Sequence, residues 1–196
     1  MGNVISGLAD RAVSDRHESY AAEIRALLDA ALIVMQRDDT IDPKVVEIVR
    51  ASGLSNQTFY RHFDGKDALL VALLADGRER LARTVARRME RSNSPVTALH
   101  AWVSAVLDQA RDSRAAAATR PFVANGERLA ITFPDEVARS RHDLIALLAP
   151  ILSDSDAIAV YHLTMGAMHE AVAARRTPSQ RDVEAIAAFA ARGCGL

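Results

Sequence analysis

The stretch GLSNQTFYRHFDGKD, residues 53–67, decides how this chain folds. Gly53 and Ser55 mark a tight turn, because glycine tolerates a positive φ and serine can cap the helix that follows. Phe59 and Phe63 lie four residues apart, which places both rings on one side of a short helix. The stretch therefore predicts a turn followed by a short helix whose aromatic side packs into a core.

A second short helix is expected before this turn. Pro43 suits the first position of a helix, Asp42 can cap it, and Gly53 can end it. Two short helices joined by a turn of about three or four residues containing glycine are typical of a helix-turn-helix. This motif is therefore predicted over residues 43–63.

The first turn of the second helix in such a motif reaches base edges in the major groove of DNA. Here that turn holds Asn56, Gln57 and Thr58. Asparagine and glutamine can pair with adenine through two hydrogen bonds, and a threonine methyl can contact a thymine methyl. Ser55 starts a helix whose free N–H groups suit a phosphate. The motif thus predicts double-stranded DNA as the partner.

The whole chain is expected to be all-α. Alanine and leucine dominate, aromatic residues make up 5%, and no convincing alternating strand pattern is present. Residues 1–16 are predicted to be an N-terminal arm. Further helices are predicted at 17–37, 66–91, 95–113, 115–126, 134–152, 155–175 and 178–192, with the clearest break at Ser92–Pro95.

Composition sets limits on the partners and the location. The 196 residues carry a net charge of −1, and neither half has a basic excess, so DNA contact must rest on a local surface and on dimerisation. The single cysteine, Cys194, cannot form an intramolecular disulfide and fits a reducing cytoplasm. No apolar run is long enough for a membrane span, so a cytoplasmic protein without a membrane partner is expected.

Residues 18–75 resemble the N-terminal domain of TetR-family transcriptional regulators. The run from Ser55 to Lys66 is the most specific part, because its aromatic pair, histidine, phenylalanine and lysine have the family's spacing. The resemblance implies a three-helix DNA-binding domain over 17–75, joined by a long fourth helix to a helical domain over 76–196. It implies DNA contacts from Lys44, Ser55, Asn56, Gln57, Thr58, Tyr60, His62 and Lys66.

These positions have different expected roles. The resemblance implies that Tyr60, His62 and Lys66 contact phosphates, whereas residues 56–58 face the bases. Lys44 stands where the family often has threonine, and its ammonium can still reach a phosphate. An ordinary structural role stays open for each: the ring of His62 can be a packing residue, and Lys66 can be a solvated lysine.

The resemblance also implies what residues 76–196 do. They would form a homodimer through the helices at 155–175 and 178–192, and enclose a pocket for a mostly apolar small molecule. The candidate lining residues are Met89, Trp102, Phe122, Tyr161, His162, Met165 and His169. Three of these, His162, Met165 and His169, share one helix face, where a metal or polar ligand is one reading and a core or dimer face with satisfied histidines is the other. No metal and no cofactor is predicted.

Residues 95–196 contain no recognisable catalytic motif, so the chain is not expected to be an enzyme. The favoured function is a ligand-responsive repressor that binds a palindromic operator as a dimer. The alternative is a small-molecule-binding or enzymatic helical protein with a vestigial DNA-binding motif, which the neutral charge of residues 1–93 supports. An activator, or a repressor without a ligand, also stays open.

Overall fold

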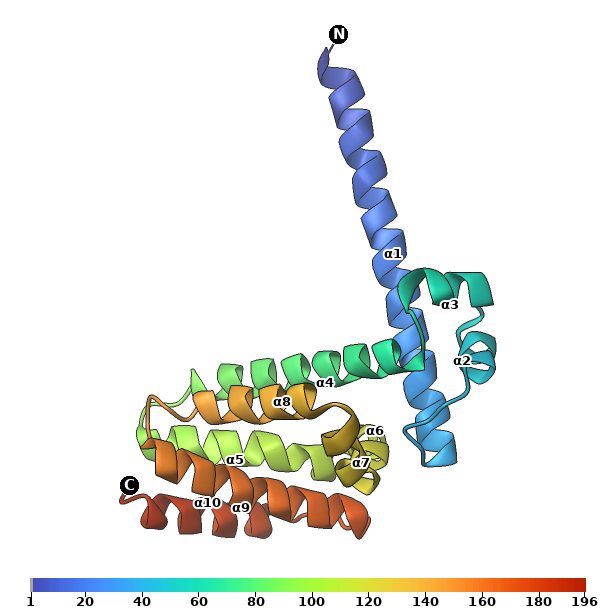
Figure 1. The fold of residues 1–196 in the computed structure, drawn as a ribbon. Helices are drawn as coiled ribbons and strands as arrows, with labels where there is room; N and C mark the ends of the chain where they lie inside the picture. The colour runs from blue at the N-terminus through green and yellow to red at the C-terminus, as the bar shows by residue number, and fades with distance from the viewer. Residues whose placement is uncertain (1) are drawn as a thin grey trace. The chain divides into compact units, whose positions relative to one another are not determined.

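The computed structural model describes residues 2–196, with the side chains of Ser14 and of residues 16–196. Every regular element in this range is an α helix (Figure 1), so the all-α prediction is confirmed. The chain divides into two compact units, with the boundary between Ala72 and Leu73. This boundary lies close to the one expected near residue 75.

Unit 1 contains α1 (Gly2–Asp38), α2 (Val45–Ser52), α3 (Asn56–His62) and the first residues of α4 (Lys66–Met89). α2 and α3 contact each other, and both lie against α1 (Figure 1). The side chains at the centre of this unit are fully buried and include Leu27, Met35, Ile48, Phe59 and Leu69. The motif's aromatic side therefore faces the core, as its spacing predicted.

Two helix starts in unit 1 differ from the prediction. α1 begins at Gly2, so the expected N-terminal arm is the first part of this helix. α2 begins at Val45 with Lys44 as its N-cap residue, and Asp42 does not cap it. The carboxylate of Asp42 instead forms an ion pair with the ammonium of Lys66. The group that was expected to cap α2 therefore has another partner.

The turn between α2 and α3 follows the sequence closely. Gly53 ends α2 with φ at +70°, a left-handed conformation that glycine adopts without strain. Ser55 caps α3, and its hydroxyl accepts the Thr58 N–H at 3.0 Å. Both features depend only on neighbouring residues, and this is why the sequence predicts them.

Unit 2 contains the rest of α4 and six further helices: α5 (Pro95–Arg111), α6 (Ser113–Ala124), α7 (Gly126–Thr132), α8 (Pro134–Ala146), α9 (Asp154–Ala173) and α10 (Gln180–Gly193). α5, α9 and α10 pack against one another, α6 lies against α5 and α9, and α8 contacts α7 and α9 (Figure 1). α5 is the most buried of these helices, with Leu99, Trp102, Val103 and Val106 all at 0% exposure.

Two elements of unit 2 differ from the prediction. α7 forms where no helix was expected, because Leu129 buries itself in the core and orders the segment around it. α8 ends at Ala146 rather than at residue 152, and short turns continue to Leu152. Pro150 has no N–H to continue the helical hydrogen bonds, which explains the early end. Among the described residues, no helix is both long and apolar enough to cross a membrane.

Candidate nucleic-acid interface

The first turn of α3 presents two free amide side chains. Asn56 and Gln57 are exposed, whereas Thr58 is half-buried. The Thr58 hydroxyl lies 3.0 Å from that of Ser55, within hydrogen-bond distance. Asn56 and Gln57 are therefore the side chains best placed to meet base edges, and Thr58 has a structural role in the cap.

Tyr60 projects from the same helix. Its side chain is 59% exposed, and its ring packs edge-on against Phe59 at 5.2 Å between centroids. This contact fixes the base of the ring while the phenol end remains in solvent. The phenol is therefore accessible, and a phosphate contact from Tyr60 stays a prediction.

His62 does not lie on this surface. Its side chain is 2% exposed, and its Nε2 lies 2.6 Å from Oε2 of Glu23, to whose carboxylate it donates a hydrogen bond. The Tyr20 ring meets the imidazole edge-on at 4.9 Å. In this structure the His62 side chain holds α3 against α1, and its phosphate contact stays a prediction.

Glu23 is the centre of a small polar cluster that joins α1 to α3. Besides His62, it accepts a hydrogen bond from Nη2 of Arg61 at 2.6 Å. The hydrogen bond from His62, and then that from Arg61, lower the pKa of Glu23 below its ordinary value. Arg61 also stacks over the Tyr20 ring at 5.4 Å. Its guanidinium remains partly exposed, so it is a further cation at this surface.

Sequence reasoning missed Glu23, Tyr20 and Arg61. Thirty-eight positions separate Glu23 from Arg61, and nothing in the pattern of the first helix marks its carboxylate. Arg61 lies inside the most specific run of the motif, so its position was a usable signal. Tyr20 was a second usable signal, because it is an aromatic residue in a polar stretch of α1, where it is 41% exposed.

Two lysines complete the candidate interface. Lys66, the first residue of α4, is 46% exposed and forms an ion pair with Asp42. Lys44 is exposed at the start of α2. The hydrogen bond from Arg37 lowers the pKa of Asp38, and the charge of Lys44 adds a smaller effect in the same direction. Cations are thus present, but carboxylates accompany them.

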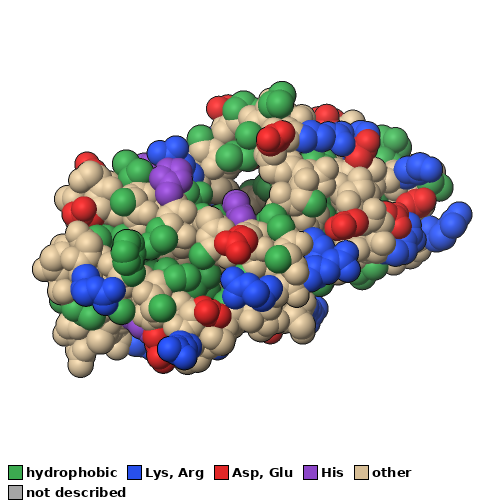
Figure 2. Space-filling view, turned by 90° about the horizontal axis from the view of Figure 1, so that it is seen from below, with side chains coloured by type: hydrophobic (Ala, Val, Ile, Leu, Met, Phe, Trp, Pro, Cys, Tyr) green, Lys and Arg blue, Asp and Glu red, His purple; other side chains and the backbone are tan. Residues whose placement is uncertain are grey.

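The surface charge is mixed. Figure 2 shows basic and acidic side chains interspersed on the face it presents, which agrees with the net charge of −1. A protein of this kind gains little from long-range attraction to DNA. Affinity must come from the contacts of the motif itself.

Four of the seven candidate pocket residues lie in the core of unit 2 or pack against it, and the ligand pocket itself stays a prediction. Trp102 is fully buried, and its Nε1–H donates to the Leu144 carbonyl oxygen at 3.0 Å. Met89, Tyr161 and Met165 pack against the same core, and burial raises the pKa of Tyr161. These residues form the centre of unit 2, and neither of its two cavities discussed below includes them.

The other candidates lie nearer the surface. Phe122 is half-buried, whereas His162 and His169 are exposed. Partial desolvation lowers the pKa of His169. No group of three His, Cys, Asp or Glu side chains within the described part of the chain is arranged to hold a metal ion.

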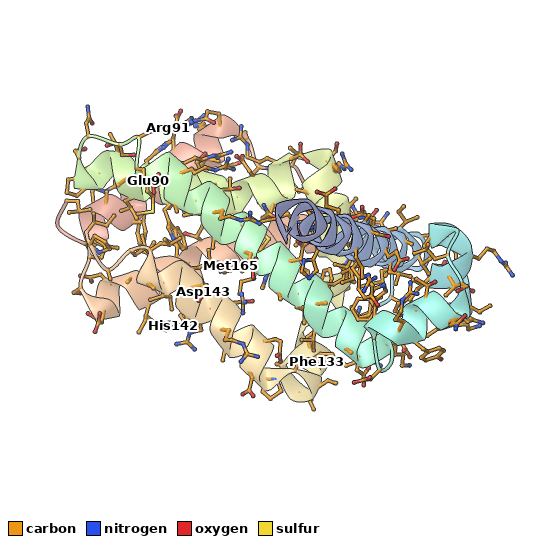
Figure 3. The ribbon with its side chains drawn as sticks, turned by 90° about the horizontal axis from the view of Figure 1, so that it is seen from above. Glu90, Arg91, Phe133, His142, Asp143 and Met165 are labelled. Carbon is orange, nitrogen blue, oxygen red and sulfur yellow. The ribbon has the colours of Figure 1, made fainter. Side chains whose placement is uncertain are left out.

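An ion pair connects α4 to α8 in unit 2. Nε of Arg78 lies 3.2 Å from Oδ2 of Asp143, and the Arg78 side chain is 17% exposed. Asp143 is on the side of α8 that faces α4, whereas the neighbouring His142 points outward (Figure 3). This pair joins α8 to α4.

Comparison with known proteins identifies the motif. Residues 27–73 match the bacterial regulatory proteins of the tetR family. An uncharacterised HTH-type transcriptional regulator of Mycobacterium tuberculosis, from strains H37Rv and CDC 1551, is 32% identical over 113 residues, which cover 56% of this chain and 55% of the relative. The chain thus spans about half the length of the curated relatives it matches.

Solved structures share the fold. A candidate transcriptional regulator from Streptomyces coelicolor A3(2) has a TM-score of 0.73 at 15% identity, covering 89% of this chain and 99% of that one. GusR of Salmonella enterica has a TM-score of 0.70 at 19% identity, covering 89% and 96%. At these identities the likeness establishes the fold.

The helix-turn-helix geometry, the matching family and the shared fold lead to one conclusion. The chain resembles TetR-family transcriptional regulators: residues 27–73 match the family, and the fold is shared with solved regulators. The matching family and the solved structures with this fold are described as transcriptional regulators.

Proposed function

We propose that this protein is a ligand-responsive repressor that binds a palindromic DNA operator as a homodimer. The observation that carries the proposal is the exposed first turn of α3, where Asn56 and Gln57 face solvent beside the Ser55 cap. These two side chains would read the bases, with the Thr58 methyl beside them. Tyr60, Lys66 and Lys44 would hold phosphates on either side.

Exposed apolar side chains on the last two helices support a dimer. Ile158 and Leu163 on α9 are 38% and 37% exposed, and Phe189 on α10 is 61% exposed. Exposed alanines such as Ala159 and Ala185 near them would let a second copy approach closely. A two-fold dimer would place its reading helices about 34–36 Å apart, one turn of DNA.

The continuity of α4 supports a route from ligand to DNA. This helix runs without a break from Lys66 to Met89, and the boundary between the units falls inside it. A ligand in unit 2 that shifts α4 would alter the spacing of the two reading helices. A coupling of about 1–3 kcal/mol is typical for such a change.

DNA binding is tested with the DNA that flanks the protein's own gene. Fluorescence anisotropy should show specific, saturable binding that Tyr60→Ala or Lys66→Ala weakens roughly tenfold, the loss of one hydrogen bond to a charged group. Ile131→Ala, a change at an exposed side chain on α7, is the matched control and should bind normally. Equal binding by all three variants would contradict the proposal.

Repression is tested separately from binding. A reporter gene behind the bound fragment should lose expression when the protein is present and regain it with an effector. Activation of the reporter would replace the repressor with an activator. Specific DNA binding that no stabilising small molecule changes would leave a repressor without a ligand.

A further inference from the structure

A cavity of about 160 Å³ lies where α5, α6 and α9 meet in unit 2. Figure 1 shows α6 beside the C-terminal ends of α5 and α9. The charged residues that line the cavity are Arg120, Arg175 and Arg176, and no carboxylate lines it. Ser113 and Thr177 add two hydroxyls, and the remaining walls are alanine and valine side chains. Its charge and donors favour an anion.

Arg120 is the most informative of the three arginines. Its Nε is fully buried and has no hydrogen-bond partner in the described part of the chain. Buried polar atoms in native proteins almost always have a partner, so the unpaired Nε of Arg120 is an unusual feature of the cavity wall. Arg120 lies within α6 and not at its end, so the helix dipole does not account for it.

Arg175 occupies a position where glycine is the usual residue. It follows the end of α9 with φ at +52°, and its N–H donates to the Val172 oxygen at 3.2 Å. The next N–H, that of Arg176, donates to the Ala171 oxygen at 2.8 Å, which completes a Schellman motif. A long side chain in this conformation is strained, which points to a use for its charge at the cavity.

Other helices of this chain are also followed by a residue with a positive φ. The equivalent positions after α2 and α10 are Gly53 and Gly195, with φ of 70° and 71°. Only after α1 and α9 does another residue stand there, Asp39 and Arg175, within the described residues. Arg175 is the long cation of this set, and it lines the cavity.

A neighbouring hollow is also lined by arginines, but its charges are balanced. That hollow also includes Thr177, but Arg88 and Arg111 there stand beside Asp108 and Asp112. Asp108 accepts from Arg88 at 2.6 Å and from Arg111 at 3.3 Å, so the charges balance internally. Of the arginines that line the cavity, Arg176 alone contacts a carboxylate within the described part of the chain, that of Asp182 at 3.4 Å.

We infer that the cavity binds a small molecule through an oxyanion, either a carboxylate or a phosphate, held by Arg120 with Arg175 beside it. The volume equals roughly five water molecules, enough for the oxyanion and a short aliphatic group against the alanine and valine walls. That this anion is the effector rests on the proposed regulatory function, whereas anion binding itself does not.

Calorimetric titration of the full chain tests the site without DNA. Sodium phosphate and sodium propionate are titrated at constant ionic strength, with sodium chloride as the reference. Binding of phosphate alone identifies a phosphate ligand, and binding of propionate alone a carboxylate. Arg120→Gln should weaken the binding roughly tenfold or more, the loss of a charge-assisted pair. Arg114→Gln, an exposed arginine on α6 outside the lining, is the matched control and should bind normally.

Two further variants keep the inference testable if Arg120→Gln folds poorly. Arg120→Lys keeps the charge without the planar fork and should bind with intermediate affinity. Arg175→Gly suits the backbone and should fold as well as the wild type while binding the anion more weakly. Absence of binding above the chloride reference, or wild-type affinity in both Arg120→Gln and Arg175→Gly, would overturn the site.

The DNA measurement separates the two proposals. If the anion binds and lowers operator affinity, it is the effector. If it binds and leaves operator affinity unchanged, the oxyanion site stands and its regulatory role fails. If no DNA is bound at all, the proposed function fails, and the titration still decides the cavity.

Discussion

At the scale of single residues, Ser55 and His62 show which structural roles can and cannot be predicted from the amino-acid sequence. Ser55 was predictable because its cap involves Thr58, only three residues away. The position of His62 was predictable from the motif, and a packing role was one of the two left open, but its partner was not predictable. That role depends on Glu23, which is 39 residues away in the chain and carries no mark in the sequence. Long-range polar partners of this kind require the fold.

The Glu23 carboxylate should make stability depend on pH. The folded state lowers its pKa below the ordinary value of 4.5 through the hydrogen bonds from His62 and Arg61. Its contribution is therefore present above that ordinary value and is lost as pH falls through the folded-state pKa. The melting temperature of the wild type should exceed that of Glu23→Gln near pH 6, and the difference should shrink toward zero at more acidic pH. A difference that is constant from pH 6 to pH 3 would contradict this.

Loss of the Ser55 cap should destabilise the motif. Ser55→Ala removes the acceptor for the Thr58 N–H and should lower the free energy of unfolding by about 1 kcal/mol. Urea unfolding of the full chain measures this. Asn56→Ala, at the next residue, should change stability by less than about 0.5 kcal/mol but alter the preferred DNA sequence. Equal stability of the two variants would show that the cap is unimportant.

At the scale of elements, most helices follow the sequence, because their starts and ends have local causes. Ser94 and Pro95 begin α5 with a capping box, as the break at that point suggested. α7 was missed, since one buried leucine and no cap define it. The candidate pocket residues stay a prediction, because the sequence does not tell whether a tryptophan or methionine on a helix face lines a cavity or fills a core.

Trp102 should make the main stabilising contact between α5 and α8. Trp102→Phe removes the donor to the Leu144 oxygen and should cost about 1–3 kcal/mol of unfolding free energy, with a further loss from the smaller ring. Tyr161→Phe is a control in the same core and should cost much less. Denaturant unfolding followed by circular dichroism compares them. A Trp102→Phe protein as stable as the control would show that the bond adds nothing.

At the scale of the whole molecule, the sequence predicted two parts and the order of helices within each, but not which surfaces stay exposed. Exposed apolar side chains on α9 and α10 became visible only in the structure, because the alanine-rich pattern alone does not tell an inner face from an outer one. The oxyanion cavity, too, became visible only in the structure. Its arginines come from α6 and from the segment after α9, which no motif connects.

The proposed dimer predicts a specific loss of assembly. Phe189→Asp on α10 should shift the protein toward monomer and weaken operator binding, because a buried charge would replace an apolar contact. Sedimentation velocity measures the assembly state. Ile131→Asp makes an equivalent change at a side chain that is 82% exposed on α7, and it should leave the dimer intact. Dissociation by both variants, or by neither, would contradict an interface on α10.

The carboxylates beside the motif's cations have a consequence for how the protein searches DNA. Lys66 must leave Asp42, and Arg61 must leave Glu23, before either can neutralise a phosphate. The freed carboxylates then attract cations from solution, which offsets part of the counterion release that normally drives protein–DNA association. Affinity should therefore fall less steeply with salt than the number of phosphate contacts suggests. Random DNA, which offers only phosphates, loses the most from this exchange, so the two acidic partners favour discrimination over tight binding.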